Sequence, residues 1–255
     1  MFDMAVAGST NAVLHILSYA YELGIELTLE DFEKYAKEIP CINAVIPSGP
    51  YTVVDFHYAG GAMNVMKMLE SKLFTDVPTM YGCPLKDVLA KVKAQENKVI
   101  HSLERPLSQE PGLKILRGNL SPNGAIVRPT AVYEEVKYLK GRAKVFEGDR
   151  PAFEAIQAGE IVPGDIIVIR YEGCKGAPGM KELMLSIDAL IGLGLHKSVG
   201  LITDARFSGF NYGAIIGHVS PEAYDGGNIA LVEEGDEIVI DIPGGEISLL
   251  VADEE

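Results

Sequence analysis

The sequence predicts an α/β protein in two parts, a helical piece followed by a mixed β/α domain. In about the first hundred residues, amphipathic runs begin at residues that cap helices and end at glycine or proline. From about residue 113 onward, short apolar runs rich in β-branched residues alternate with turns. A polar stretch with two prolines, residues 104–112, separates the two patterns and is typical of a linker.

Four helices are expected in the first part. The first follows the capping pair Ser9 and Thr10, and the second is capped by Thr28 and stops before Pro40. The third lies behind two consecutive glycines. The expected ranges are about residues 10–23, 29–39, 62–71 and 85–94.

Two strands of the second part are expected to be buried on both faces. Residues 166–169 are four consecutive β-branched apolar residues, and residues 199–202 form a similar apolar run. The last two expected strands are separated by a Pro-Gly-Gly turn, which indicates a hairpin. The other expected strands are residues 113–116, 125–128, 143–146, 237–242 and 246–251.

Two further helices are expected in the second part. One covers residues 151–158, capped by Asp149 and closed by Gly159. The other covers about residues 180–190 and directly follows a glycine-rich loop. Strands and helices that alternate in this way predict a mixed β/α domain.

Charge and composition exclude several classes of protein. The chain has 22 basic and 36 acidic residues and a formal net charge of −14. This charge repels phosphate backbones and anionic lipids, so neither a nucleic-acid partner nor a membrane partner is expected. The longest apolar run, residues 189–195, is too short to span a bilayer. The three cysteines, Cys41, Cys83 and Cys174, form no paired framework, which favours a cytoplasmic location.

The loop of residues 170–182 follows the first buried strand and carries a candidate functional residue. Its three glycines and one proline would let backbone N–H groups approach an anion at the start of the next helix. The alternative is a tight strand–helix connection with a charged helix start. Glu182, expected in the first turn of that helix, is either a metal-binding carboxylate or a complement to the helix dipole.

The loop of residues 203–213 follows the second buried strand. Arg206 can bind a carboxylate through two parallel hydrogen bonds, and Ser208 is a candidate nucleophile or base beside Gly209. No histidine lies within three residues of Ser208, and no GxSxG motif occurs, so a serine hydrolase has little support. The alternative is an ordinary serine in a turn.

Six segments along nearly the whole chain have counterparts, in the same order, in one enzyme family. They are GSTNAVLH (8–15), PSG (47–49), LRGNL (116–120), GCKGAPGM (173–180), TDARFSG (203–209) and GHVSPEA (217–223). On these motifs the chain resembles the dihydroxy-acid dehydratase / phosphogluconate dehydratase family, and within it the dihydroxy-acid dehydratases most.

The resemblance implies a fold and an organisation of the chain. Residues 1–108 would be the trailing, helical part of the family's N-terminal α/β domain, and residues 109–255 its β-barrel-like swivelling C-terminal domain. Family members are about twice as long as this chain. The chain is therefore expected to be a C-terminal half, clipped by a short stretch at its end. It would need the missing N-terminal half or a partner chain, and a homo-oligomer is expected.

The resemblance also implies an iron–sulfur cluster and Mg²⁺. The family's cluster cysteines lie in CDKxxPG- and GACGG-type motifs, which this chain lacks, so its own cysteines are not expected to be cluster ligands. The glutamate of the family's GPGMPEM motif is a Mg²⁺ ligand and matches Glu182. The aspartate and modified lysine that also hold Mg²⁺ in the family have no counterpart here.

The implied activity is that of a hydro-lyase that dehydrates 2,3-dihydroxy acids to 2-keto acids in branched-chain amino-acid biosynthesis. Ser208 matches the serine regarded as the base in the family's DGRFSG motif. Arg206, Gly209 and Asn211 are expected to contact the small dihydroxy-acid substrate. The chain by itself is expected to be inactive.

Four departures from the family pattern lie near this chemistry and leave the substrate open. Ala205 and Phe210 replace glycines, Asn211 replaces a serine or threonine, and Lys181 replaces a proline. One alternative is a dehydratase of sugar acids. The other is a non-catalytic subunit that has lost the cluster.

Overall fold

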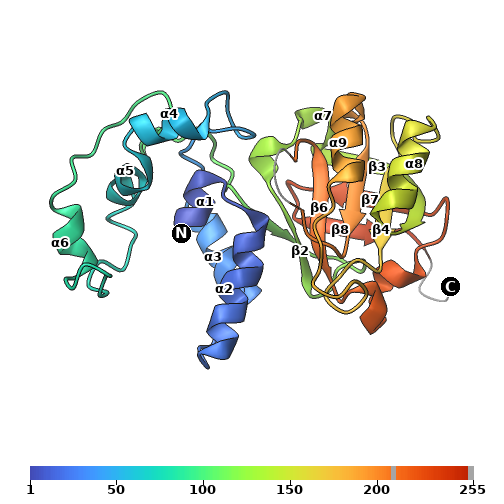
Figure 1. The fold of residues 1–255 in the computed structure, drawn as a ribbon. Helices are drawn as coiled ribbons and strands as arrows, with labels where there is room; N and C mark the ends of the chain where they lie inside the picture. Colours follow the sequence, from blue (N-terminus) through green and yellow to red (C-terminus); the bar gives the residue numbers. More distant parts are fainter. Residues whose placement is uncertain (208–210, 252–255) are drawn as a thin grey trace. The chain divides into compact units, whose positions relative to one another are not determined.

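The computed structural model describes residues 1–207 and 211–251, which form two compact units (Figure 1). The helical unit comprises Met1–Gly8 and Glu30–Leu113, and the barrel unit comprises Ser9–Leu29 and Lys114–Glu255. Ser208, Gly209 and Phe210 lie outside the described residues. Of the four helices expected in the first part, the first therefore lies in the barrel unit.

The helical unit consists of short helices around a small core. α1 contacts α5, and α5 in turn contacts α4 and α6. Buried apolar side chains of this unit include Met4, Val65 and Leu89. The helices are α1 (Phe2–Val6), α3 (Leu29–Glu38), α4 (Val53–Tyr58), α5 (Gly61–Met68) and α6 (Leu85–Leu89). The second and third expected helices are thus confirmed as α3 and α5, whereas the fourth, α6, is shorter than expected.

The polar stretch that was expected to be a linker is hydrogen-bonded to the helical unit. The N–H group of Gly112 donates to the carbonyl oxygen of Met4 at 2.8 Å, and the N–H group of Ser108 donates to that of Cys41 at 3.2 Å. A Cβ atom on Gly112 would lie 2.3 Å from Cα of Ala7, so only glycine allows this close approach.

α2 (Thr10–Glu22) confirms the first expected helix, including both of its ends. Ser9 is the N-cap residue, and its side chain accepts a hydrogen bond from the N–H group of Asn11. Gly24 follows the helix with a φ of +64°, which is the left-handed conformation expected of a glycine at this position.

The barrel unit is built on one eight-stranded sheet of order β1-β2-β6-β5-β4-β3-β7-β8. β3, β4, β5 and β6 are parallel neighbours, and the remaining pairs are antiparallel. The strands are β1 (Lys114–Leu116), β2 (Gly124–Val127), β3 (Tyr138–Glu147), β4 (Ile166–Arg170), β5 (Gly200–Thr203), β6 (Ala214–Ser220), β7 (Glu237–Asp241) and β8 (Glu246–Leu249). The expected hairpin is confirmed as β7 and β8.

The two outer strands of this sheet meet, so the sheet is nearly closed into a barrel. Arg117, directly after β1, pairs in parallel with Glu246 of β8. Its N–H group donates to the carbonyl oxygen of Gly245, and its carbonyl oxygen accepts from the N–H group of Ile247, both at 2.9 Å. The expectation of a barrel-like β/α unit is thereby confirmed for the shape of the sheet.

The central strands are buried on both faces, as their apolar sequences predict. Ile166 and Val168 of β4 belong to the core inside the barrel. Ile167 and Ile169, which alternate with them, belong to a second core outside the barrel. The outer core includes side chains of α8 (Asp149–Gln157) and α9 (Leu185–Gly192). The remaining helical segments are α7 (Glu134–Lys137) and the short 3₁₀ segments Pro129–Ala131, Leu195–Lys197, Ala223–Asp225 and Asn228–Leu231.

β6 was not expected from the sequence, although it lies in the middle of the sheet. Glycine and histidine interrupt its apolar pattern at positions 217 and 218. Gly217 is needed because a Cβ atom there would lie 2.4 Å from the ring of Phe207. The approach of Phe207 to β6 therefore requires a glycine at position 217, and this glycine breaks the apolar run that would have predicted a strand.

The helix expected from residue 180, α9, begins only at Leu185. The helix that Asp149 was expected to cap, α8, has Asp149 as its first residue. The N-cap residue of α8 is Gly148, which makes no side-chain capping hydrogen bond. The expectation that Asp149 caps α8 is therefore wrong. Its carboxylate instead accepts hydrogen bonds from the start of α9, as described below.

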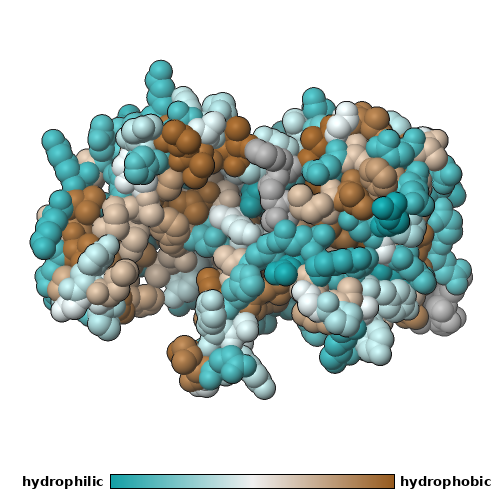
Figure 2. All heavy atoms as spheres, viewed as in Figure 1, coloured by the Kyte–Doolittle hydropathy of each residue, from teal (hydrophilic) through white to brown (hydrophobic). Residues whose placement is uncertain are grey.

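Large apolar side chains are exposed on both units. Figure 2 shows hydrophobic residues at the surface near α4 and at the C-terminal end of α2. Val53 on α4 is 70% exposed, and Leu23 after α2 is 72% exposed. None of the helices in the described part of the chain combines the length and the apolar character needed to span a membrane.

Candidate active site

Two loops leave the carboxyl ends of β4 and β5, which are parallel neighbours in the sheet. Because the carboxyl ends of parallel strands lie at the same edge of a sheet, the two loops meet there. Glu182 of the first loop pairs with Arg206 of the second in an isolated parallel bridge. The N–H group of Leu183 donates to the carbonyl oxygen of Arg206 at 2.9 Å. The structure thus brings together two of the residues that the sequence singled out.

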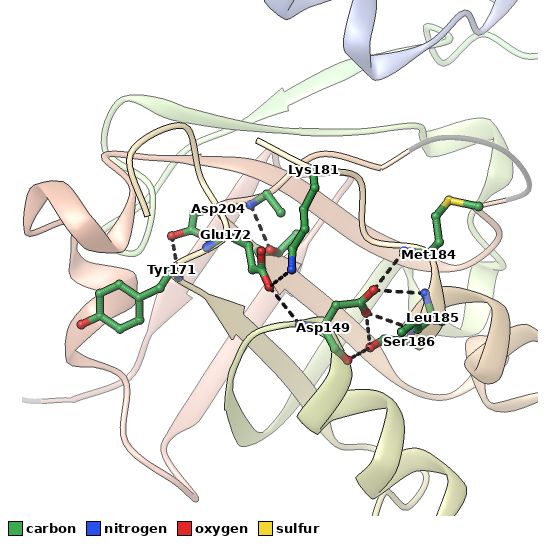
Figure 3. A network of polar contacts seen from close by, with 10 residues as sticks. Asp149, Tyr171, Glu172, Lys181, Met184, Leu185, Ser186 and Asp204 are labelled. Atoms are coloured by element: carbon green, nitrogen blue, oxygen red, sulfur yellow. Dashed lines mark hydrogen bonds and ion pairs between the residues drawn. The ribbon is translucent and has the colours of Figure 1, made fainter. Parts of the chain in front are cut away.

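Glu182 lies in this extended segment and not in the first turn of a helix. The N–H groups at the start of α9 already have an anionic partner, because the Asp149 carboxylate accepts from Met184, Leu185 and Ser186 at 3.0–3.2 Å (Figure 3). These N–H groups therefore have an acidic partner within the chain, and Glu182, which lies before α9 begins, does not complement the dipole of that helix. The glycine-rich segment is a strand–helix connection.

The start of α2 forms a third part of the site. Asn11 Nδ2 donates to Glu182 Oε1 at 2.7 Å and lies 3.5 Å from the carbonyl oxygen of Phe207. The hydroxyl of Thr10 donates to the same carbonyl oxygen at 3.4 Å. Sequence reasoning assigned no function to Asn11. The available signal was its place in the GSTNAVLH segment.

Asp204, at the end of β5, fixes the beginning of the loop that carries Glu182. Its carboxylate accepts hydrogen bonds from the N–H groups of Tyr171 and Glu172, both at 3.1 Å (Figure 3). A third N–H group, that of Ala223, donates to it at 3.0 Å. Burial raises the pKa of Asp204, and the three N–H groups oppose this shift because they stabilise the anion.

Glu172 and Lys181 join the two ends of the same loop. Glu172 is buried, and its Oε1 accepts from the N–H group of Asp149 at 3.2 Å and pairs with Lys181 Nζ at 3.0 Å (Figure 3). Lys181 stands where the family pattern has proline. An ion pair thus restrains the loop directly beside Glu182.

Two of the expected substrate contacts, Arg206 and Asn211, have hydrogen-bond partners within the protein. Arg206 Nε donates to the carbonyl oxygen of Met180 at 2.5 Å. Asn211 is 3% exposed, and its Oδ1 accepts from Nη1 of Arg128 at 2.8 Å. Ser208 and Gly209 lie outside the described residues. Substrate binding by Arg206, Gly209 and Asn211 stays a prediction.

His218 is a further unusual residue near Phe207. It has a φ of +56° within β6, and its ring lies 6.3 Å from that of Phe207. Burial, assisted by the charge of Arg206, lowers the pKa of His218 to about 4. Its imidazole is therefore neutral at physiological pH.

The residues around Glu182 suit Mg²⁺ as part of a ligand set. Carboxylate and amide oxygens are the ligands that Mg²⁺ prefers. Asn11 is 9% exposed, and its Oδ1 is buried without a hydrogen-bond partner among the described residues, which leaves an oxygen acceptor beside Glu182. Within residues 1–207 and 211–251, no group of three or more His, Cys, Asp or Glu side chains is arranged to hold a metal ion. Among the described residues, Glu182 would therefore need further ligands to hold Mg²⁺.

The cysteines do not fit an iron–sulfur cluster. Cys41 is buried in the helical unit, where its Sγ lies 3.6 Å from the carbonyl oxygen of Asn43. Cys174 is exposed in the barrel unit, with its Sγ 3.4 Å from Sδ of Met180. The part of the chain that the structure describes gathers no cysteine ligand set.

Curated relatives with high similarity cover this chain almost completely. A protein named dihydroxy-acid dehydratase from Clostridium novyi (strain NT) is 49% identical over 255 residues, which is 99% of this chain and 46% of the relative. Proteins of the same name from Ignicoccus hospitalis and Geobacter sulfurreducens are 47% and 46% identical, over 99% and 98% of this chain and 46% and 45% of their own lengths. The chain spans about half the length of the curated relatives it matches.

Two family models match consecutive parts of the chain. The model described as Dihydroxy-acid/6-phosphogluconate dehydratase N-terminal matches residues 1–88. The corresponding C-terminal model matches residues 98–255, which is more than half of the chain. The chain belongs to the dihydroxy-acid/6-phosphogluconate dehydratase family.

Proposed function

We propose that this chain is the C-terminal half of a hydro-lyase that converts 2,3-dihydroxy acids to 2-keto acids. The observation that carries this proposal is the bridge between Glu182 and Arg206. It joins the family's metal-ligating glutamate to the segment that leads, two residues later, to the family's catalytic serine, Ser208.

In this proposal Ser208 acts as an alkoxide and takes the proton from C2 of the substrate. The C2–H electron pair becomes the C2–C3 double bond as the C3–O bond breaks, and the 3-hydroxyl group departs with that bond's electrons and takes up a proton to become water. The resulting enol then tautomerises to the 2-keto acid. A serine hydroxyl is a poor base at neutral pH, so it needs positive charge nearby to lower its pKa. Glu182 would help hold Mg²⁺, which would supply positive charge that stabilises the negative charge developing on the substrate.

The remaining parts of the enzyme are proposed to come from outside this chain. Because its own cysteines gather no ligand set, an iron–sulfur cluster would be held by the missing N-terminal half or a partner chain. Exposed apolar side chains such as Val53, Val54 and Met80 support such a partner, or a homo-oligomer, because a partner would bury them. We place the enzyme in the cytoplasm, in branched-chain amino-acid biosynthesis.

A hybrid enzyme tests this function. The part of the Clostridium novyi relative outside the match is combined with this chain, which replaces the matched part, and the cluster is reconstituted anaerobically. We expect the hybrid to form a 2-keto acid from a 2,3-dihydroxy acid in a Mg²⁺-dependent reaction. A properly folded hybrid that contains the cluster and forms no keto acid would reject the proposal.

The role of Glu182 is tested in the same hybrid. Glu182→Gln removes a charged oxygen ligand, so half-maximal activity should require a higher Mg²⁺ concentration, and added Mg²⁺ should partly relieve the defect. Glu160→Gln removes an exposed carboxylate of the same unit and serves as the control. An unchanged Mg²⁺ requirement in Glu182→Gln would contradict the assignment.

A further inference from the structure

The beginning of α2 contacts both loops of the candidate site. Asn11 Nδ2 donates to Glu182 Oε1 at 2.7 Å, across 171 positions of the sequence. Asn11 and Thr10 also approach the carbonyl oxygen of Phe207, the residue before Ser208. All of these residues belong to the barrel unit. The helix start therefore connects the segment with the metal ligand to the segment with the proposed base.

The Asn11 side chain is held in a defined position. Ser9 caps the helix by accepting from the N–H group of Asn11 at 3.2 Å, which fixes the backbone at this residue. Thr10 and Asn11 are 2% and 9% exposed. A buried side chain on a capped helix has few rotamers available, so its amide group is a fixed donor for the Glu182 carboxylate.

A neutral amide has suitable chemistry for this place. Its N–H group fixes one carboxylate oxygen of Glu182 without bringing a positive charge, so the amide itself does not compete with a divalent cation for that carboxylate. A lysine or arginine would compete with that cation, and an ionised aspartate would repel Glu182. Carboxylates that bind metal ions are commonly oriented by such outer hydrogen bonds.

We propose that Asn11 is a positioning residue for the metal ligand Glu182. Its Nδ2–Oε1 hydrogen bond sets the orientation in which the carboxylate binds the divalent cation. The inference rests on the proposed function, because it takes Glu182 to be a metal ligand. It adds a residue from the N-terminal end of the chain to the site.

The test measures binding of Mn²⁺, a spectroscopic substitute for Mg²⁺, to the hybrid enzyme by electron paramagnetic resonance. Asn11→Ala should weaken Mn²⁺ binding by about 10- to 100-fold, the range found when outer-shell hydrogen bonds of metal ligands are removed. Asn123→Ala removes an exposed asparagine of the same unit and should leave the affinity unchanged. An Asn11→Ala hybrid that folds and binds Mn²⁺ as tightly as the parent overturns the inference.

A double variant separates positioning from a merely structural hydrogen bond. Asn11→Asp combined with Glu182→Gln exchanges the amide and the carboxylate and can re-form the bond between positions 11 and 182. We expect the thermal midpoint to return towards that of the parent while Mn²⁺ binding stays weak. Restored Mn²⁺ binding overturns the inference, because the orientation of the carboxylate at position 182 would then not matter. A parent hybrid that binds no Mn²⁺ rejects the metal role of Glu182 itself, and with it the proposed function.

Discussion

His218 combines a left-handed backbone conformation with a buried, neutral imidazole ring. The ring Nε2 is buried without a hydrogen-bond partner among the described residues, and the backbone N–H group of His218 donates to the carbonyl oxygen of Ala205 at 2.9 Å. Non-glycine residues with positive φ are uncommon and are concentrated at functional sites. The ring is thus held beside Phe207 in a form that does not carry a proton at neutral pH.

This histidine should make the free energy of unfolding depend on pH. In the folded state its pKa is lowered to about 4, from 6.5 for an unperturbed histidine. Between these values the unfolded state binds more protons, so stability is fully present above pH 6.5 and is lost as the pH falls towards 4. The shift corresponds to about 3 kcal/mol.

Urea unfolding between pH 4 and pH 7 measures this effect. His218→Asn removes the titrating group and keeps a residue that tolerates positive φ, so its stability should vary less over the same range. Equal pH dependence in the parent and in His218→Asn would show that His218 is not buried in its neutral form.

Part of the site could be predicted from individual residues. Glu182 and Arg206 each follow a strand that the sequence marks as buried, so their place at one edge of the sheet follows from the pattern. The contact of Asn11 with Glu182 could not be predicted, because nothing local to either residue indicates a partner 171 positions away.

At the scale of the elements, capping residues in the sequence correctly indicated where helices begin. They did not always indicate which helix each residue caps. Ser9 caps α2 as expected, whereas Asp149 serves a helix that begins 36 positions later in the sequence. Its carboxylate accepts from three N–H groups at the start of α9 and from the hydroxyl of Ser186 at 2.6 Å. A carboxylate near two helices can cap either of them, and only the fold decides which.

Asp149→Ala should destabilise the barrel unit. It removes the acceptor for several N–H groups at the start of α9, and the loss of such a cap costs about 2 kcal/mol. The matched control is Asp188→Ala, which removes an exposed carboxylate from the first turn of the same helix and should cost less than about 1 kcal/mol. Urea unfolding of both variants gives the two values. Equal losses would mean that the buried hydrogen bonds of Asp149 add nothing beyond a charge near the helix.

Some strands could be predicted from their own sequence, whereas the sequence of β6 depends on packing against a distant segment. Apolar runs with β-branched residues correctly predicted β4 and β5, because both faces of these strands are covered. β6 was missed because its pattern is broken at Gly217, where Phe207 of another segment approaches the backbone. The glycine at position 217 is explained by this packing contact, which the periodicity of the β6 sequence does not reveal.

At the scale of the whole molecule, the chain carries only some of the residues of the proposed dehydratase site. It carries Glu182 and the segment towards Ser208. Cys41 and Cys83 lie in the helical unit and Cys174 lies in the barrel unit, and no cysteine ligand set is found in residues 1–207 and 211–251. Its length is about half that of the relatives it matches. The proposed reaction therefore requires groups that this chain does not supply.

The isolated chain should bind no iron–sulfur cluster. Anaerobic reconstitution followed by iron and sulfide assays should find far less than one cluster per chain, because the three free cysteines are scattered. The hybrid enzyme, treated in the same way, serves as the positive control. A stoichiometric cluster on the isolated chain would contradict the structure's account of its cysteines.

The turnover of the hybrid enzyme with Ser208→Ala tests the central claim most directly, since the claim is that this chain supplies the base of the reaction. The variant should lose about 10²- to 10⁴-fold in kcat, the usual contribution of a general base, with little change in substrate binding. Ser71→Ala, at an exposed serine of the helical unit, should keep the parent's kcat. A Ser208→Ala hybrid with kcat within a few-fold of the parent would mean that the base lies elsewhere and that the claim is wrong.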